Sequence, residues 1–474
     1  MAEAPGRDAL LDRFARIVGD RHALRADADM ASYVHERRGL HPGRAALVLR
    51  PGSADEVADI LALATATGTP VVPQGGNTGL VGGQVPDASG RAVVLSLARM
   101  DRIRSLDPAS DTVVAEAGVV LQTLRDAAAA AGRLFPLALA SQGSAQVGGL
   151  LSTNAGGTAV LAHGSMRDLC LGLEVVLPTG ERLDDLRRLR KDNTGYDLKQ
   201  LFIGAEGTLG VITAAVLRLV PRPRGRQLAW LGVDSPAAAL ALLALAQAHA
   251  GSGLVACELV GETVLGFALA HVPGLRRPLE PPPPWSVLLE VASHRGEDDA
   301  RATVEALLVE ALAAGVARDA VLPSSHAQAD ALWRIRESLS DAQRPEGLSF
   351  KHDIAVPLAR IPEFIERADA CVQALAPGAR IACFGHLGDG NLHYNVSQPA
   401  GAPAAAFEPL RGAVAEAVHA LALALDGTLS AEHGIGQLKR EALAATAPPV
   451  ALALMRRLKA TIDPAGIMNP GKVL

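Results

Sequence analysis

Aromatic residues are scarce in this chain of 474 residues, where Phe, Trp and Tyr together make up 3%. Proteins that bind single-stranded nucleic acid stack bases on aromatic rings and attract the phosphate backbone with clustered positive charge. Here 45 Lys and Arg residues stand against 50 Asp and Glu residues, which gives a formal net charge of −5. With few rings and no basic excess, the composition argues against nucleic-acid binding.

Cysteine is also rare, and no two of the four cysteines form a C-x-x-C pair: Cys170, Cys257, Cys371 and Cys383. This spacing disfavours a disulfide framework, an iron–sulfur cluster and a cysteine zinc site, and it is typical of a reducing compartment. The N-terminal stretch lacks the apolar core of a signal peptide, and no apolar run approaches the ~20 residues that span a bilayer. We therefore expect a cytoplasmic protein that can still dock peripherally on a membrane.

The length of the chain exceeds that of a usual single hydrophobic core, so two or more domains are expected. Hydrophobic residues make up 49% and charged residues 20%, as in a folded globular protein. After PRPRGR, which begins at Pro221, strand-like and helical stretches alternate as in an α+β module of βαβ type. We expect a first domain over residues 1–222, an α+β domain over 223–424, and a C-terminal segment, 425–474, that returns to the first domain.

A strand–helix–strand unit is predicted near the start of the first domain. ALVLRP, from Ala46, has the character of a buried strand, and TPVVPQGG, from Thr69, that of a second strand. Between them, Ser53 and Glu56 have the spacing of a capping box at a helix start, and Gly68 marks the helix end.

Three tracts rich in glycine and small residues occur in the first domain: PQGGNTGLVGG (73–83), GSAQVGGLLSTNAGGT (143–158) and FIGAEGTLGVIT (202–213). Backbone N–H groups without side chains in the way can form a concave site for phosphate. None of the tracts is a G-x-G-x-x-G or P-loop motif. One glycine tract alone is more often a structural turn, but three in one domain favour a cofactor that carries phosphate, without identifying it.

The stretch GHLGDGNLHYN, from Gly385, predicts a β-hairpin with Asp389-Gly390 as a two-residue turn. In that register His386 lies opposite His393, and Asn395 lies on the same face as His393. Opposed side chains are close enough to converge on one metal ion. A shift of one residue would put the histidines on opposite faces. The alternative is an incidental pair of cross-strand histidines.

A second segment, SAEHGIGQLKR, supplies Glu432 and His433 directly before two glycines. Two histidines and one carboxylate form a typical catalytic site for a divalent metal, and the imidazoles favour zinc over manganese or iron. The alternative is that Glu432 and His433 are a solvated pair at a helix end.

Two basic residues are candidates for holding an acidic substrate. The helical periodicity of ALWRIRESLSDA, from Ala331, places Arg336 on the apolar face, where its charge needs an anion. That anion is either a carboxylate of the protein or one of a substrate. Lys351, in SFKHDIAVP, is either exposed on a strand or a second substrate contact.

The three glycine tracts, in this order and spacing, resemble the FAD domain of the vanillyl-alcohol-oxidase (PCMH-type) family, and the resemblance resumes at the C-terminal NPGKVL. It implies an α+β fold with a two-subdomain FAD-binding domain, a ferredoxin-like α+β substrate domain and a C-terminal helical segment. Some members of the family attach FAD through a His or Cys in the first tract, which has neither here, so dissociable FAD is implied. The implied FAD contacts are Gly75, Gly76, Asn77, Thr78 and Gly79 at the pyrophosphate, Ser141, Gly148, Gly149, Ser152 and Asn154 along the flavin and ribityl chain, Glu206, Gly207 and Ile212 near the adenine, and Asn469.

GHLGDGNLHYN and SAEHGIGQLKR resemble the metal and catalytic segments of the flavin-dependent D-2-hydroxyacid dehydrogenases in this family. The resemblance implies His433 as general base, His386, His393 and Glu432 as metal ligands, and Arg336, Ser340, Lys351 and Asn395 as substrate contacts. Relatives often have Thr at the position of Ser340, so the hydroxyl is retained.

The implied reaction is oxidation of a D-2-hydroxyacid, with hydride transfer to FAD. The first glycine tract and the overall spacing are most similar to members acting on D-2-hydroxyglutarate, and D-lactate or glycolate is the alternative. Two other functions known on this fold, a non-redox ether-lipid transferase and a non-catalytic flavin subunit of an oxidase complex, are disfavoured because the metal segments are intact. The electron acceptor stays open among a quinone, an electron-transfer flavoprotein and a cytochrome, and a homodimer is the prior expectation.

Overall fold

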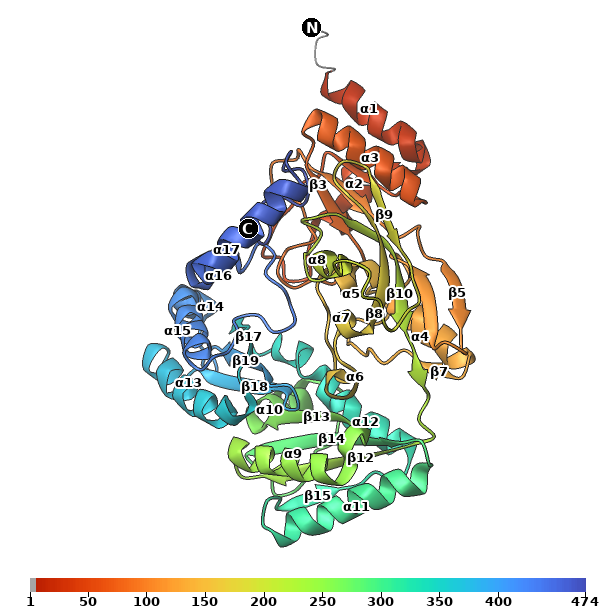
Figure 1. The fold of residues 1–474 in the computed structure, drawn as a ribbon. Helices are drawn as coiled ribbons and strands as arrows, with labels where there is room; N and C mark the ends of the chain where they lie inside the picture. Colours follow the sequence, from red (N-terminus) through yellow and green to blue (C-terminus); the bar gives the residue numbers. More distant parts are fainter. Residues whose placement is uncertain (1–5) are drawn as a thin grey trace. The chain divides into compact units, whose positions relative to one another are not determined.

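In the computed structural model, which describes residues 6–474, the chain divides into two compact units (Figure 1). Of the described residues, unit 1 contains 6–156, 165–222 and 432–474, and unit 2 contains 157–164 and 223–431. The first five residues, part of the N-terminal stretch considered for a signal peptide, lie outside the described residues. Within the described part of the chain, no helix is both long and apolar enough to cross a membrane.

The first sheet of unit 1 has the strand order β1-β2-β4-β3, with β1 (Ala23–Leu24), β2 (Leu47–Leu49), β3 (Val71–Gln74) and β4 (Val93–Ser96). Helix α3 (Ala54–Thr67) connects β2 to β3, so the predicted strand–helix–strand unit is confirmed (Figure 1). The hydroxyl of Ser53 accepts a hydrogen bond from the Glu56 N–H at 3.2 Å, and Gly68 ends the helix in the left-handed conformation with φ 64°. Two further helices, α1 (Arg7–Val18) and α2 (Asp27–Val34), precede this unit.

The second sheet of unit 1 is antiparallel throughout, with the order β5-β6-β10-β8-β9. Its strands are β5 (Ile103–Asp107), β6 (Thr112–Glu116), β8 (Cys170–Val176), β9 (Arg182–Asp185) and β10 (Val211–Arg218). The short strands β7 (Arg133–Leu134) and β11 (Val220–Pro221) pair separately. The helices in this part are α4 (Leu121–Ala130), α5 (Val147–Ser152), α7 (Met166–Leu169) and α8 (Lys199–Phe202).

The C-terminal residues lie beside strand β3 of unit 1. The Val71 N–H donates to the Ile467 carbonyl, and the Asn469 N–H donates to the Val71 carbonyl, both at 2.8 Å. Two helices precede this contact, α16 (Arg440–Thr446) and α17 (Pro449–Ile462).

Unit 2 contains a mainly antiparallel sheet in the order β15-β12-β14-β13-β18-β19-β16, with β17 beside β19. The first four strands and their helices follow the ferredoxin-like pattern of two interleaved βαβ halves: β12 (Gly225–Val233), α9 (Pro236–Ala250), β13 (Leu254–Gly261), α10 (Glu262–His271), β14 (Trp285–Ser293), α11 (Glu297–Ala313) and β15 (Asp319–Val321). The rest comprises α6 (Val160–His163), α12 (His326–Ser338), β16 (Ser349–Phe350), β17 (Asp353–Ala355), α13 (Ile361–Leu375), β18 (Arg380–His386), β19 (Asn391–Ser397), α14 (Ala404–Phe407) and α15 (Arg411–Ala424). The predicted α+β fold class is confirmed.

Both faces of the unit 2 sheet are covered by helices. Along β12, Ala229, Leu231 and Val233 belong to the hydrophobic cluster with α9 and α11, whereas Leu228 and Trp230 belong to the cluster with α10 and α12. Alternate side chains of a strand point to opposite faces, so this one strand supplies both cores. Helix α12, which carries Arg336, is thereby held on the α10 face of the sheet.

The register of the β18–β19 hairpin differs from the predicted one. His386 pairs with Asn391 and Phe384 with His393, so the turn has four residues, 387–390, and the two-residue turn was wrong. The two-residue turn favoured by Asp-Gly requires φ > 0 at both central residues. Gly390 has φ 82°, but Asp389 is not among the residues with positive φ. Because the shift is an even number of residues, His386 and His393 still lie on one face, as diagonal rather than direct neighbours.

Candidate active site

The short strand β17 brings an acidic residue to the hairpin. Asp353 lies directly opposite His393 of β19. The backbone beyond α15 then runs beside β17, because Thr428 bridges Ala355 and the Ala431 N–H donates to the Asp353 carbonyl at 3.2 Å. Glu432 and His433 follow this anchored residue directly in the chain, so backbone hydrogen bonds bring them to Asp353.

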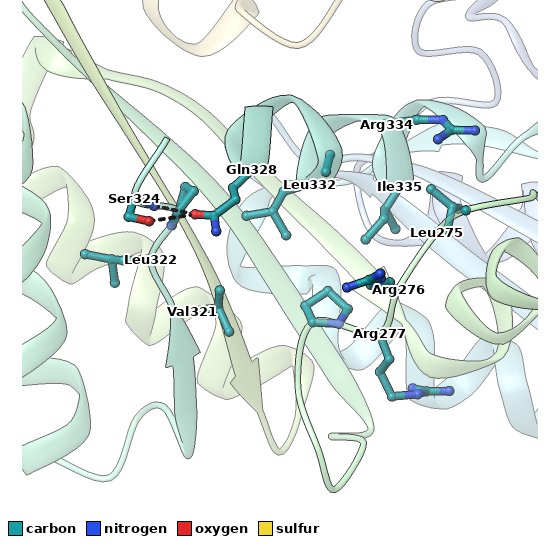
Figure 2. Close-up of a pocket in the computed structure, with 14 residues that line it drawn as sticks. Leu275, Arg276, Arg277, Val321, Leu322, Ser324, Gln328, Leu332, Arg334 and Ile335 are labelled. Atoms are coloured by element: carbon teal, nitrogen blue, oxygen red, sulfur yellow. Dashed lines mark hydrogen bonds between the residues drawn. The ribbon is translucent and has the colours of Figure 1, made fainter. Parts of the chain in front are cut away.

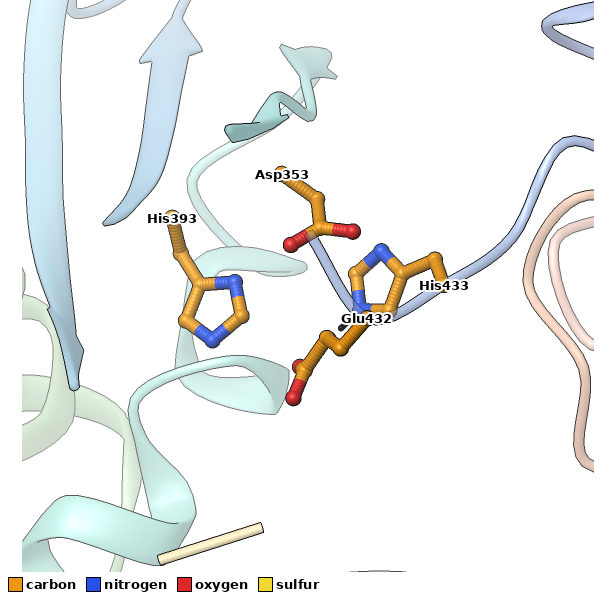
Figure 3. A group of neighbouring side chains, drawn as sticks. All are labelled: Asp353, His393, Glu432 and His433. Atoms are coloured by element: carbon orange, nitrogen blue, oxygen red, sulfur yellow. Dashed lines mark ion pairs between the residues drawn. The ribbon is translucent and has the colours of Figure 1, made fainter. Parts of the chain in front are cut away.

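Four side chains therefore form a candidate metal site, shown in Figure 3. Ligand atoms of Asp353, His393, Glu432 and His433 all lie within 4.8 Å of one another, with Asp353 buried and the other three partly exposed. The Nε2 atom of His433 lies 3.4 Å from Oε1 of Glu432. Two imidazoles with two carboxylates are a donor set that suits a first-row divalent metal such as zinc, manganese or iron.

Of the predicted site residues, this group contains His393, Glu432 and His433, but not His386. The ring of His386 lies edge-on to that of His393, with centroids 5.7 Å apart. Its Nδ1 atom is 2.9 Å from Oε1 of Glu258 in the neighbouring strand β13. His386 is thus next to the group and is oriented by a carboxylate that the sequence analysis did not select.

Sequence reasoning missed two acidic residues here, Asp353 and Glu258. Asp353 reaches the site only through the pairing of the three-residue strand β17 with β19, and strand pairing is a long-range property. Glu258 did have a local signal, since it is the one charged residue in the apolar strand LVACELVG. A charge in such a strand is costly unless it is paired, and it therefore marks a buried partner.

Arg336 lies on the buried face of α12, as its periodicity predicts, with 7% of the residue exposed. Its Nε and Nη2 atoms lie 2.8 and 2.7 Å from Oε2 of Glu258. Burial alone would raise the pKa of Glu258, but the attraction of His386 and Arg336 outweighs it and lowers that pKa. The sequence left two possible anions for Arg336, a carboxylate of the protein or one of a substrate. The structure shows the first of these, Glu258, and contact between Arg336 and a substrate stays a prediction.

The three other residues predicted to contact the substrate also belong to unit 2: Ser340, Lys351 and Asn395. The Lys351 ammonium donates to Oε1 of Gln343, and Lys351 is half-buried. Ser340 is exposed at the start of a 3₁₀ turn, 341–343. Asn395 is buried in β19, where its Oδ1 accepts a hydrogen bond from the His352 N–H at 3.3 Å.

A separate cavity of about 490 Å³ lies in unit 2, between α12, the end of β15 and the loop around Gly274 (Figure 2). Its wall includes Leu332 and Ile335 of α12, and Arg276 and Arg277 lie at its edge. None of the predicted site residues lines this cavity, so it is distinct from the candidate metal site.

The first glycine tract packs tightly against the second in unit 1. A Cβ atom on Gly76 would lie 1.8 Å from the Ser144 carbonyl oxygen, so no other residue fits there without displacing the backbone. Asn77 has φ 53°, and its side-chain amide donates to the Ser32 and His35 carbonyls at 2.9 and 2.8 Å. Within the described chain, the backbone N–H groups of residues 75–79 donate no hydrogen bond to the protein. They match the anion-binding arrangement expected for a pyrophosphate.

Three buried acceptor atoms in these segments also have no hydrogen-bond partner among the described residues: Oδ1 of Asn77, Oε1 of Gln146 and Oδ1 of Asn469. Buried polar atoms in native proteins nearly always have a partner. A ligand with N–H and O–H donors, as in a flavin and its ribityl chain, would supply those partners. The backbone N–H groups of residues 75–79 and these three acceptor atoms together fit FAD as a ligand.

The remaining predicted FAD residues lie in or next to the three glycine tracts of unit 1. Gly148 is closely packed, because a Cβ there would lie 2.7 Å from Cβ of Ala117, whereas a Cβ on Gly149 would meet nothing within 4 Å. Ile212 lies in β10 with its side chain in the hydrophobic core. Of the others, Thr78 and Gly79 lie in the first tract, Ser152 and Asn154 in the second, Gly207 in the third, and Ser141 two residues before the second.

Glu206 joins the third tract to the segment that follows His433. Its two carboxylate oxygens accept hydrogen bonds from the Ile435 and Gly436 N–H groups at 2.7 and 2.8 Å. Burial raises the pKa of Glu206, against the effect of these two hydrogen bonds. The Asn469 amide donates to the Glu206 carbonyl at 2.8 Å. Within unit 1, Glu206 therefore holds the backbone two and three residues beyond His433.

Replacing Glu206 by glutamine is expected to loosen this segment, because an NH₂ group would then face a backbone N–H donor. The loss of a hydrogen bond to a carboxylate is worth about 1.5–3 kcal/mol, measured as the free energy of unfolding in urea. Glu116→Gln is a matched control, since Glu116 is also buried in unit 1 and pairs with Arg102 and Arg104. Only Glu206→Gln should also slow flavin reduction, and equal rates in both variants would contradict the assignment.

Comparison with known families covers both units. The family described as FAD linked oxidases, C-terminal domain, matches residues 222–473, and the FAD binding domain family matches residues 45–185. Solved structures of similar fold include p-cresol methylhydroxylase with substrate bound, at TM-score 0.77 and 13% identity over 100% of this chain and 98% of that one. The 4-ethylphenol oxidase of Gulosibacter chungangensis matches at TM-score 0.74 and 18% identity, over 100% of this chain and 98% of that one.

These matches define the chain as an FAD-dependent oxidoreductase with a PCMH-type flavin fold. Mitochondrial D-2-hydroxyglutarate dehydrogenase of Bos taurus is 40% identical over 91% of this chain and 77% of its own length. The D-2-hydroxyglutarate dehydrogenase of Xanthomonas citri pv. viticola is 35% identical over 94% of this chain and 93% of its own length. The chain belongs to the D-2-hydroxyglutarate dehydrogenase family of FAD-linked oxidases.

Proposed function

We propose that this protein oxidises D-2-hydroxyglutarate to 2-oxoglutarate with FAD as the immediate electron acceptor. The observation that carries the proposal is the convergence of His393, Glu432 and His433, together with Asp353, on one point. A base beside a metal-ligand group is what the deprotonation of a 2-hydroxyl requires. Relatives at 35–40% identity are D-2-hydroxyglutarate dehydrogenases, which supports D-2-hydroxyglutarate as the substrate.

In this proposal each group of the chain has one task. His433 removes the proton of the 2-hydroxyl, while His386, His393 and Glu432 hold a divalent ion, zinc first and manganese or iron as alternatives. Arg336, Ser340, Lys351 and Asn395 bind the carboxylates and fix which face of C2 is presented to the flavin. When bound, FAD supplies a two-electron acceptor, and the ion supplies positive charge that favours an ionised hydroxyl.

A substrate panel tests the choice of acid. D-2-hydroxyglutarate is expected to reduce the bound flavin about 10- to 100-fold faster, at subsaturating concentration, than D-lactate, D-malate or glycolate. D-lactate and glycolate lack its distal carboxylate, and one charge-assisted hydrogen bond contributes about 1.5–3 kcal/mol. D-malate has a distal carboxylate, but one methylene group closer to C2, so it is expected to reach the same partner with poorer geometry. Anaerobic stopped-flow absorbance of the flavin measures these rates. Faster reduction by D-lactate or glycolate would assign the enzyme to those alternatives.

The partners beyond the substrate are part of the same proposal. Electrons leave the reduced flavin to a quinone, an electron-transfer flavoprotein or a cytochrome, and two copies of the chain associate as a homodimer. We place the protein in the cytoplasm or peripherally on a membrane. The bound FAD is dissociable, because the first glycine tract contains no His or Cys.

A further inference from the structure

Glu258 is the most completely buried carboxylate in the described part of unit 2, with 1% of the residue exposed. It lies in the middle of β13, directly opposite His386 of β18. Its oxygens contact different nitrogen groups, Oε1 the Nδ1 of His386 at 2.9 Å and Oε2 the Nε of Arg336 at 2.8 Å. One carboxylate therefore contacts both a predicted metal ligand and a predicted substrate contact.

The contact with Glu258 restricts the orientation of the His386 imidazole. When Nδ1 donates its proton to a carboxylate, the ring is held in one orientation, and Nε2 keeps the lone pair that a metal ion requires. The ring of His386 also lies edge-on to that of His393, which belongs to the candidate metal site. Glu258 is thus the outer member of a carboxylate–histidine pair whose imidazole lies beside His393 of that site.

The contact with Arg336 fixes the guanidinium in the same way. Arg336 lies over the ring of Phe384, 5.0 Å from its centroid, and Phe384 is the cross-strand partner of His393. Nη2 also lies 2.7 Å from Oε2 of Glu258, within ion-pair distance, but it is buried and forms no hydrogen bond within the described chain. Because a guanidinium carries five N–H donors, Arg336 still has donors for a second carboxylate beside Glu258.

Resting on the proposed function, we infer that Glu258 is a positioning residue that orients His386 toward the metal ion and Arg336 toward the substrate carboxylate. It touches neither ion nor substrate, and acts through these two side chains. Both effects need a carboxylate with two acceptor oxygens. A neutral amide has a single acceptor and leaves the buried guanidinium without its counter-charge.

The test compares Glu258→Gln with a matched variant, Glu290→Gln. Glu290 lies in the adjacent strand β14, is a half-buried carboxylate, and accepts a hydrogen bond from the Trp333 indole at 2.7 Å. Glu258→Gln is expected to weaken zinc binding by about 10- to 100-fold, measured by competition with a chromophoric chelator. It should also raise the KM for D-2-hydroxyglutarate, whereas Glu290→Gln should change neither quantity by more than about twofold.

If Glu258→Gln folds poorly, a double variant that also replaces Arg336 by methionine removes both buried charges together. Such a replacement is often neutral for stability, so the double variant should regain thermal stability but not zinc affinity. Wild-type zinc affinity in either Glu258 variant would overturn the inference. Failure of the proposed function is a separate result, because the unaltered protein would then bind no zinc or leave its flavin oxidised with every acid in the panel.

Discussion

Replacing His433 by alanine is expected to slow the reduction of bound flavin by D-2-hydroxyglutarate by about 10²- to 10⁴-fold, the usual contribution of a general base. The imidazole is the basic group of the four-residue cluster that is not among the predicted metal ligands. Its loss should not change FAD content, because His433 is not among the predicted FAD contacts. Anaerobic stopped-flow absorbance gives the rate, and the absorbance ratio of flavin to protein gives the FAD content.

His326→Ala provides a control for the loss of an imidazole at an exposed position, at the start of α12. Its rate of flavin reduction should match that of the unaltered protein. If His433→Ala also reduced its flavin at that rate, another group would have to remove the proton, and the base assignment would be wrong.

Removing the divalent ion is expected to slow turnover by a factor similar to that of His433→Ala. Without it, the hydroxyl of a 2-hydroxyacid keeps its high pKa, and the carboxylates of Asp353 and Glu432 repel each other within the cluster. Treatment with a chelator should therefore bring turnover close to background, and added zinc or manganese should restore it. Metal analysis of the purified protein, expressed as ions per FAD, accompanies the activity measurement.

His393→Ala separates this effect from damage by the chelator. The variant should lose the bound ion while retaining FAD, because His393 belongs to unit 2 and the predicted FAD residues to unit 1. Full activity in protein shown to be free of metal would remove the ion from the mechanism, and the proton transfer would then rest on His433 alone.

Local features were predictable because short-range chemistry determines them. The start and end of α3 follow from the hydroxyl of Ser53 and from the freedom of Gly68 to adopt positive φ. The burial of Arg336 follows from helical periodicity in α12. The fold class and the FAD domain were implied by the family resemblance of the glycine tracts, and family models match residues 45–185 and 222–473.

The hairpin shows how a local signal can be outweighed. Asp389-Gly390 is a strong two-residue turn signal, yet in the folded chain Asn391 donates its side-chain amide to Asp353 at 3.0 Å and to the Ile354 carbonyl at 2.9 Å. These contacts with β17 accompany a longer turn and a shifted register. His386 and His393 still lie on the same face of the hairpin only because the register shifted by an even number of residues.

By itself, the sequence determined which residues are candidates for the metal, substrate and FAD sites. Residue type, strand alternation and glycine spacing are encoded over a few positions. Only the tertiary structure decided their partners. It placed Asp353 opposite His393, and Glu258 in contact with both His386 and Arg336. It also made the Glu206 carboxylate the acceptor of a backbone hydrogen bond from Ile435, two residues beyond His433. The physical reason is that a buried charge selects its partner through strand pairing and packing between residues up to 230 positions apart, and no local pattern records that choice.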